Sequence, residues 1–180
     1  MIITGGKYKG RKIIAPDEKI TRPTLSKVRQ GVFNVLFSEI GNFQDKVFLD
    51  LFGGSGLMGL EALSRDFKEV IVFEKNPKIA QILKKNYALL GLNPNLKIGD
   101  SLKLLKNFNK DIDVIYIDPP YFSGIYENIF ELLQNKVKES TIIIAEHVEN
   151  INIQNFNLLK EKNYGNKKIS FFSIKKQNLE

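Results

Sequence analysis

The chain has 180 residues, enough for one substantial hydrophobic core and too few for two well-formed domains with a linker. It contains no cysteine and one histidine, which excludes a disulfide framework and thiolate chemistry and argues against a histidine-based metal site. Apolar residues make up 43% of the chain, yet no apolar run approaches the roughly 20 residues that span a membrane. We therefore expect a monomeric cytoplasmic protein without a metal site or a membrane segment.

The net charge of +7 is concentrated at one end of the chain. Residues 1–30 hold eight basic and two acidic side chains, a net charge of +6, and the rest of the chain is close to neutral. A positive field at one end suits a protein that binds a polyanion there, although lysine-rich sequences also carry solvated basic surfaces. The candidate nucleic-acid contacts are Lys7, Lys9, Arg11, Lys12, Arg22, Lys27 and Arg29.

The first forty residues predict two small elements. Residues 1–16 alternate weakly around a Gly-Gly pair, which predicts a short hairpin. Apolar side chains then recur at helical spacing and predict a helix over residues 24–38, with Lys27 and Arg29 on its exposed face. Neither element has enough apolar surface to stand alone. We therefore expect residues 1–40 to form a basic extension that binds RNA.

The remaining chain, residues 41–180, alternates strand and helix patterns and is expected to form the main domain. Strands are predicted over residues 47–52, 70–74, 96–98, 114–117 and 141–145. Helices are predicted over residues 57–64, 77–90, 101–106, 125–133 and 156–162, and residues 168–175 are expected to form a hairpin arm. Strands that alternate with helices predict a parallel sheet covered on both faces.

A glycine turn follows the first of these strands. Gly54, Gly56 and Gly59 match the G-x-G-x-x-G fingerprint, and Glu74 lies about 20 residues further on, where a ribose-binding carboxylate belongs. Glycines permit a close backbone approach, and the Glu74 carboxylate can accept both ribose hydroxyl protons. This pattern suits NAD, FAD or S-adenosylmethionine.

Four predicted strands end in or beside an acid, namely Asp50, Glu74, Asp100 and Asp118. Ligands bind beyond the carboxyl ends of the strands in such sheets, where acids repel a pyrophosphate but attract the sulfonium and ammonium groups of S-adenosylmethionine. Asp50 suits a cation, and Asp100 with Ser101 can accept from an adenine amino group. The candidate cofactor residues are Asp50, Gly53, Gly54, Ser55, Gly56, Glu74, Asp100 and Ser101.

The turn Asp118-Pro119-Pro120-Tyr121 offers hydrogen-bond acceptors and no donors. The Asp118 carboxylate and the Pro119 carbonyl can hold both hydrogens of an exocyclic amine, and Tyr121 provides a flat face for the ring that carries it. We expect Asp118, Pro119 and Tyr121 to be the catalytic residues. Hydride transfer does not require a pocket that binds an amine, so the turn favours a methyltransferase over a nicotinamide oxidoreductase. A basic RNA-binding module without catalysis would leave the strand-end acids without a role.

The sequence resembles the RsmD family of 16S ribosomal RNA guanine-N2 methyltransferases nearly from end to end. Three stretches carry the resemblance: residues 5–11 with 22–34, residues 49–62, and the Asp118-Pro119-Pro120-Tyr121 turn. The resemblance implies a class I S-adenosylmethionine-dependent methyltransferase fold, which is Rossmann-like with a mostly parallel seven-stranded sheet. It also implies a 16S ribosomal RNA or small-subunit substrate.

The Asp118 motif alone does not separate guanine N2 from adenine N6 or cytosine N4, because all three bases present an exocyclic amine. A chain this short has no room for a separate recognition domain, so we expect specificity to come from the shape of a folded RNA or an assembled particle. His147 is expected in a loop without a catalytic role, because no motif accompanies it.

Overall fold

The computed structural model describes residues 1–16, 26–120 and 124–176. Its helices are α1 (Ser26–Ile40), α2 (Leu57–Ser64), α3 (Pro77–Ala88), α4 (Ser101–Lys106) and α5 (Ile125–Leu133). Its strands are β1 (Val47–Asp50), β2 (Glu69–Glu74), β3 (Asn95–Ile98), β4 (Val114–Ile117), β5 (Ile142–His147), β6 (Phe156–Tyr164) and β7 (Lys167–Ile174). None of the described helices is long and apolar enough to cross a membrane.

The strands form one seven-stranded sheet in the order β3-β2-β1-β4-β5-β7-β6. The pairs among β1 to β5 are parallel, whereas β7 runs antiparallel to both of its neighbours, β5 and β6. The strand order reverses between β1 and β4. Ligands bind outside the carboxyl ends of the strands at such a reversal, so this topology places the site there.

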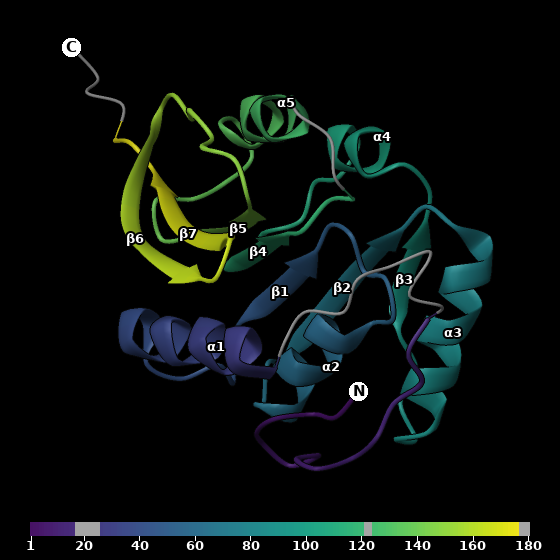
Figure 1. Ribbon diagram of the computed structural model, residues 1–180. Coiled ribbons are helices and arrows are strands. Elements are labelled where there is room, and N and C mark those ends of the chain that lie inside the picture. Colours follow the sequence, from purple (N-terminus) through teal and green to yellow (C-terminus); the bar gives the residue numbers. More distant parts are fainter. Residues whose placement is uncertain (17–25, 121–123, 177–180) are drawn as a thin grey trace.

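Helices cover both faces of the sheet, as predicted. In Figure 1, α1, α2 and α3 lie on one face, and α4 and α5 lie on the other. Each face has its own cluster of buried apolar side chains, with Phe33, Leu60 and Leu83 in the first and Leu105 and Phe130 in the second. Every residue of β4 is buried because this central strand contributes side chains to both clusters.

The predicted bounds of α2, α4, α5 and β4 agree with the structure. Asn76 caps α3 as expected, since its side-chain oxygen accepts from the backbone nitrogen of Lys78 at 2.9 Å. The helix predicted over residues 156–162 is wrong, because these residues belong to β6 and pair with β7. Leu158 and Leu159 lie on successive positions of this edge strand and are both exposed, so the segment lacks the alternation that marks a half-buried strand.

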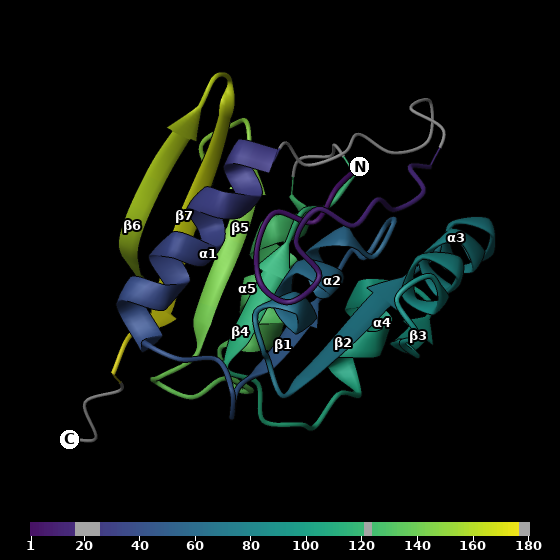
Figure 2. The same cartoon turned by 90° about the horizontal axis from the view of Figure 1, so that it is seen from below.

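The N-terminal segment, residues 1–16, lies against α2 in both views (Figures 1 and 2). The predicted hairpin is reduced there to a single antiparallel bridge between Ile2 and Lys12. Ile3 and Ile13 are nevertheless buried in the same apolar cluster as α1 and α2. The segment is thus packed into the core of the main domain.

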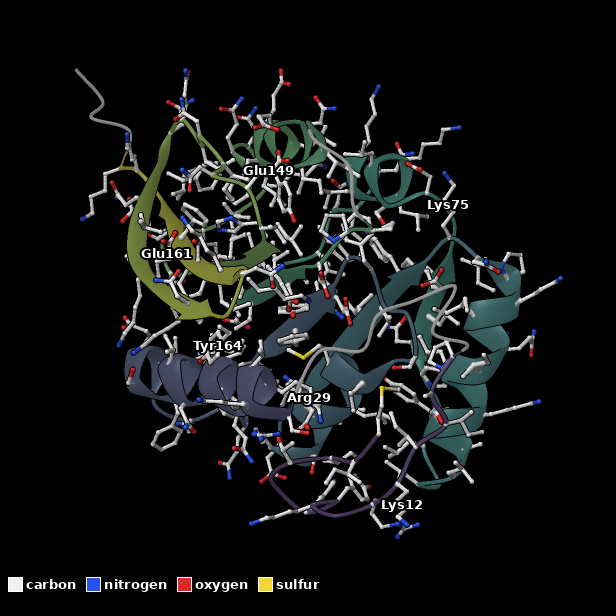
Figure 3. The ribbon with its side chains drawn as sticks, in the orientation of Figure 1. Lys12, Arg29, Lys75, Glu149, Glu161 and Tyr164 are labelled. Carbon is white, nitrogen blue, oxygen red and sulfur yellow. The ribbon has the colours of Figure 1, made fainter. Side chains whose placement is uncertain are left out.

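A buried ionic cluster fastens this segment to the two helices. The Glu61 carboxylate, on α2, accepts from the Arg29 Nε at 3.0 Å and from the backbone nitrogen of Thr4 at 2.8 Å, and it also pairs with Arg65. Arg29 in turn donates to the Ile2 carbonyl at 2.7 Å and lies between α1 and the N-terminal segment (Figure 3). Only 2% of the Arg29 side chain is exposed. The prediction that Arg29 lies on an exposed face and contacts RNA is therefore wrong.

The hairpin of β6 and β7 packs closely on α1. A Cβ atom added at Gly31 would lie 1.8 Å from the hydroxyl oxygen of Tyr164, the last residue of β6. Tyr164 is labelled beside α1 in Figure 3. Any side chain at Gly31 would therefore require the Tyr164 side chain to move.

Candidate functional site

A cavity of about 1270 Å³ opens at the carboxyl ends of the parallel strands. The ends of β1, β2, β4 and β5 line it, together with the start of β7. Met1 and Pro16 also line it, so both ends of the N-terminal segment border the cavity. All of the predicted cofactor residues except Gly56 line it, as do Asp118 and Pro119.

The glycine turn between β1 and α2 leaves no space for a side chain at Gly53 or at Gly56. A Cβ atom at Gly53 would lie 2.1 Å from a methyl carbon of Val72, and the Gly53 nitrogen donates to the Phe73 carbonyl at 2.8 Å. Gly56 has a φ of 81°, which favours glycine, and it begins α2. Gly53 and Gly54 therefore present backbone without side chains to the cavity, directly beside β2.

Glu74 holds this turn in place from the end of β2. One carboxylate oxygen accepts from the Gly54 nitrogen at 2.8 Å, and the other accepts from the Asn76 nitrogen at 2.7 Å. An ionised carboxylate has about four acceptor positions, so about two remain for a ligand. These positions suit a pair of ribose hydroxyls, as the sequence pattern predicts.

Asp50 is buried at the end of β1 and accepts from the Phe52 nitrogen at 3.1 Å. Burial raises the pKa of Asp50 to about 7, with a further contribution from the Glu74 charge. Burial also raises the pKa of Tyr87, as does the charge of Asp50. Among the described residues, the Tyr87 hydroxyl is the buried side-chain polar atom without a hydrogen-bond partner. A cationic ligand group beside Asp50 would favour its charged form.

Asp100 and Ser101 begin α4 at the end of the strand β3. The Asp100 carboxylate accepts from the Lys103 nitrogen at 3.2 Å and pairs with Lys75 at 3.2 Å. Lys75 is labelled where it follows β2 in Figure 3. The Ser101 hydroxyl donates to the Leu51 carbonyl. Both residues are thus held in position at the rim, and the Ser101 oxygen keeps its acceptor lone pairs.

The opposite side of the cavity contains residues that sequence reasoning missed. The Tyr116 hydroxyl donates to the Glu146 carboxylate at 2.7 Å, and Lys167 pairs with the same carboxylate. The Tyr126 hydroxyl donates to the Glu146 carbonyl at 2.5 Å. Burial raises the pKa of Tyr116, together with the charges of Glu146 and Asp118, so its phenol stays protonated. Glu146 follows an apolar run, which is the same strand-end signal that identified the other four acids.

Two predicted site residues, Tyr121 and Arg22, lie outside the described residues. Lys7, Lys9, Arg11, Lys12 and Lys27 are exposed, and Arg11 donates to the Leu89 carbonyl at 3.1 Å. Lys12 is labelled on the outer side of the N-terminal segment in Figure 3.

His147 is not in a loop as predicted. It is the last residue of β5, where Ser170 Oγ lies 2.8 Å from its Nε2 and the Glu149 carbonyl lies 2.7 Å from its Nδ1. Because both ring nitrogens are engaged in hydrogen bonds, the ring is held in place at the edge of the cavity.

The family model described as Conserved hypothetical protein 95 matches residues 1–173. Ribosomal RNA small subunit methyltransferase D from Escherichia coli (strain K12) is 34% identical over 152 residues, which cover 82% of this chain and 75% of that protein. The protein of the same name from Haemophilus influenzae is 34% identical over 174 residues, covering 91% of this chain and 88% of that protein. The chain belongs to the RsmD family.

The fold agrees with this membership of the RsmD family. The solved structure from Escherichia coli that carries the name methyltransferase yhhF matches with a TM-score of 0.86 and 28% identity, covering 98% of this chain and 99% of that one. The chain therefore has the class I methyltransferase fold, and S-adenosylmethionine is its methyl donor. The nicotinamide oxidoreductase that the glycine fingerprint left open is excluded.

Proposed function

We propose that this RsmD-family protein transfers a methyl group to the N2 amine of a guanine in small-subunit ribosomal RNA. The observation that carries the proposal is that Asp118 and Pro119 open into the same cavity as the glycine turn and Glu74. The names of the relatives from Escherichia coli and Haemophilus influenzae specify small-subunit ribosomal RNA. The guanine N2 position follows from the family resemblance of the sequence.

The cofactor half of the proposed site consists of the glycine turn, Glu74, Asp50 and the Asp100-Ser101 pair. S-adenosylmethionine supplies an electrophilic methyl group when it is bound. Glu74 would accept from the ribose hydroxyls, and Asp50 would balance the positive charge of the ligand. Asp100 and Ser101 would accept from the adenine amino group. Bare backbone at Gly53 and Gly54 allows the ligand to approach the turn closely.

The acceptor half consists of Asp118, Pro119 and Tyr121. The lone pair of a guanine N2 amine is delocalised into the ring, so the amine is a poor nucleophile. Two hydrogen bonds, one to the Asp118 carboxylate and one to the Pro119 carbonyl, would favour the charge that develops on nitrogen during transfer. The ring of Tyr121 would stack on the extruded guanine.

The basic N-terminal segment would contact the RNA backbone beside the cavity. Lys7, Lys9, Arg11 and Lys12 are exposed there, and both ends of the segment border the cavity. A chain without a separate recognition domain would recognise the shape of a folded RNA or of an assembled particle. We therefore propose the assembled small subunit in the cytoplasm, rather than protein-free RNA, as the substrate.

The test is labelled methyl transfer to small-subunit particles from a strain that lacks the gene, followed by nucleoside analysis. We expect N2-methylguanine and faster labelling of particles than of an equal amount of naked 16S RNA. The Asp118→Asn variant should lose most transfer and keep its cofactor affinity. Asp111→Asn is the matched control, because this exposed carboxylate precedes the same strand and pairs with Lys138 instead. Labelled N6-methyladenine or N4-methylcytosine would refute the guanine assignment.

A further inference from the structure

Three neighbouring strands bring an acid, an acid and a base to one wall of the cavity. Asp118 follows β4, Glu146 lies near the end of β5, and Lys167 begins β7. Because β7 is antiparallel to β5, its first residue lies at the edge where the parallel strands end. The register pairs Ile117 with Ala145 and Glu146 with Ile169. Side chains alternate between faces along a strand, so Asp118, Glu146 and Lys167 project from the same face of the sheet.

Glu146 is the most deeply buried of the three residues. It is only 2% exposed, and its oxygens accept from Tyr116 and from Lys167. The Tyr126 hydroxyl holds the backbone of the same residue at 2.5 Å. These contacts use about two of the four acceptor positions of a carboxylate, which leaves acceptor capacity at a residue that lines the cavity.

Stability alone does not explain this arrangement. A buried ion pair is often no more stable than apolar side chains of similar volume, because both charges must lose their hydration. Apolar side chains in place of the whole group would pack against Ile144 and Ile169, which are fully buried neighbours on this face. A fixed carboxylate with an adjacent ammonium group is instead suited to recognise a ligand that presents a donor beside an acceptor.

The Watson–Crick edge of guanine presents that pattern. Its N2 amine and its N1–H are donors, and its O6 is an acceptor. The strand order β4, β5, β7 presents an acceptor, an acceptor and a donor in the matching sequence. Adenine and cytosine instead have an acceptor ring nitrogen next to their amine, and an ionised carboxylate cannot donate to it.

We propose that Glu146 accepts from guanine N1–H and that Lys167 donates to guanine O6, so that these two residues select guanine among amine-bearing bases. This inference rests on the proposed function, since Asp118 must hold the reacting N2 amine at the other end of the same edge. Tyr116 and Tyr126 are positioning residues, because they contact Glu146 and fix its orientation.

The test uses small-subunit particles reconstituted with 16S RNA in which the target guanosine, mapped from the methylated product, is replaced by 2,6-diaminopurine riboside. This analogue keeps the amine at C2, but its N1 is an acceptor and an amino group replaces O6. Sites built to hydrogen-bond one group can reject an analogue without it by factors of about 10⁴. We expect the wild-type protein to methylate guanine at least about 100-fold faster than the analogue.

The Glu146→Gln variant should reduce this preference at least about tenfold, because an amide can donate to N1 of diaminopurine. Glu161→Gln is the matched control, since Glu161 lies on β6 and contacts Ser170 outside the cavity lining (Figure 3). The control should keep the wild-type preference. Tyr116→Phe should reduce the preference less than Glu146→Gln does, because the carboxylate remains.

The outcomes separate this inference from the proposed function. If wild-type protein labels guanine and diaminopurine particles at equal rates, the inference is wrong and the proposed function stands. If it labels no guanine in any particle, the proposed function itself fails. If Glu146→Gln fails to fold or to bind cofactor, the comparison of guanine with diaminopurine in the wild-type protein can still overturn the inference. A Glu146→Gln protein that folds and keeps the full preference would also overturn the inference.

Discussion

The side-chain nitrogen of Asn86 donates to the carbonyl of Ser55 at 2.9 Å. The same amide holds Ile14, accepting from its nitrogen at 2.7 Å and donating to its carbonyl at 3.0 Å. Asn86 is fully buried on α3. One side chain therefore joins the basic N-terminal segment to the glycine turn that lines the cavity.

We expect Asn86→Leu to weaken cofactor binding as well as folding. The substitution leaves three backbone groups without this partner, and each unsatisfied buried group costs about 1–3 kcal/mol. Denaturant unfolding and calorimetric titration with S-adenosylmethionine measure the two effects. Asn107→Leu is the control, because that amide makes one long, exposed contact to the Lys103 carbonyl. A loss of stability with unchanged cofactor affinity would show that Asn86 does not support the turn.

Glu74→Gln tests the proposed ribose contact. The glutamine keeps one carbonyl acceptor for the backbone of the glycine turn but loses the charge. We expect the Kd for S-adenosylmethionine to rise by the equivalent of about 1.5–3 kcal/mol, the usual range for hydrogen bonds to charged groups. Glu69→Gln, at the start of the same strand, provides the comparison, since Glu69 pairs with Lys110 outside the cavity lining. Equal affinities of the wild-type and Glu74→Gln proteins would remove Glu74 from the site.

Asp50 makes the stability of the cofactor-free protein depend on pH. Its pKa is raised from 3.8 to about 7 in the folded state, so the folded protein holds this proton more tightly than the unfolded chain does. The stabilisation is complete below about pH 4 and is lost as the pH rises through 7, with a size of about 4 kcal/mol. Denaturant unfolding from pH 4 to 8 should show a steeper decline for wild-type protein than for Asp50→Asn. Parallel curves would contradict this role.

Arg29 and Lys27 lie close together on α1, but Arg29 is buried in an ionic cluster and Lys27 is exposed. Arg29→Met leaves the buried Glu61 carboxylate short of one partner and should lower the free energy of unfolding by about 3 kcal/mol. Lys27 is exposed, and Lys27→Met should change that free energy by less than about 0.5 kcal/mol. Urea denaturation of both variants measures the difference. Comparable losses in the two variants would mean that the ionic cluster does not hold the segment.

The exposed basic side chains of the N-terminal segment should set the salt dependence of RNA binding. Replacing Lys7, Lys9, Arg11 and Lys12 with glutamine should flatten the log–log slope of affinity against salt by about 3, since each phosphate contact contributes about 0.7–0.9. Filter binding at several salt concentrations gives the slope, and cofactor affinity should stay constant. A control variant changes four exposed lysines elsewhere: Lys106, Lys110, Lys138 and Lys176. An equal change of slope in the control would show that the contact is spread over the whole surface.

Local patterns were sufficient to predict the parallel half of the fold. β4 is a short apolar run followed by Asp118 and a Pro-Pro pair, and α3 begins with Asn76 and a proline, so each element has signals at its own boundary. The antiparallel end of the sheet has weaker signals. Residues 156–162 pair with β7 through an edge strand whose side chains are mostly exposed, so little apolar pattern distinguishes strand from helix there.

The shared location of the candidate cofactor residues was predictable for the same reason as the parallel strands. Its glycines and acids follow strands that the sequence itself identifies, and the structure brings them to one cavity. Lys167 was not predictable, because its position depends on the reversed direction of β7. The prediction for Arg29 was wrong because its charge suggested exposure. Its buried partner, Glu61, lies on a helix formed by a distant stretch of sequence, so the local pattern around Arg29 does not show the pair.

The contact between Gly31 and Tyr164 has a consequence for the order of folding during synthesis. α1 is synthesised well before the hairpin that packs on it, because α2, α3, α4, α5 and five strands lie between them in the sequence. Contacts between residues so far apart in sequence form late, because the long connecting loop must close first. The side of α1 that faces the hairpin therefore stays uncovered until β6 and β7 have been made and have packed against it.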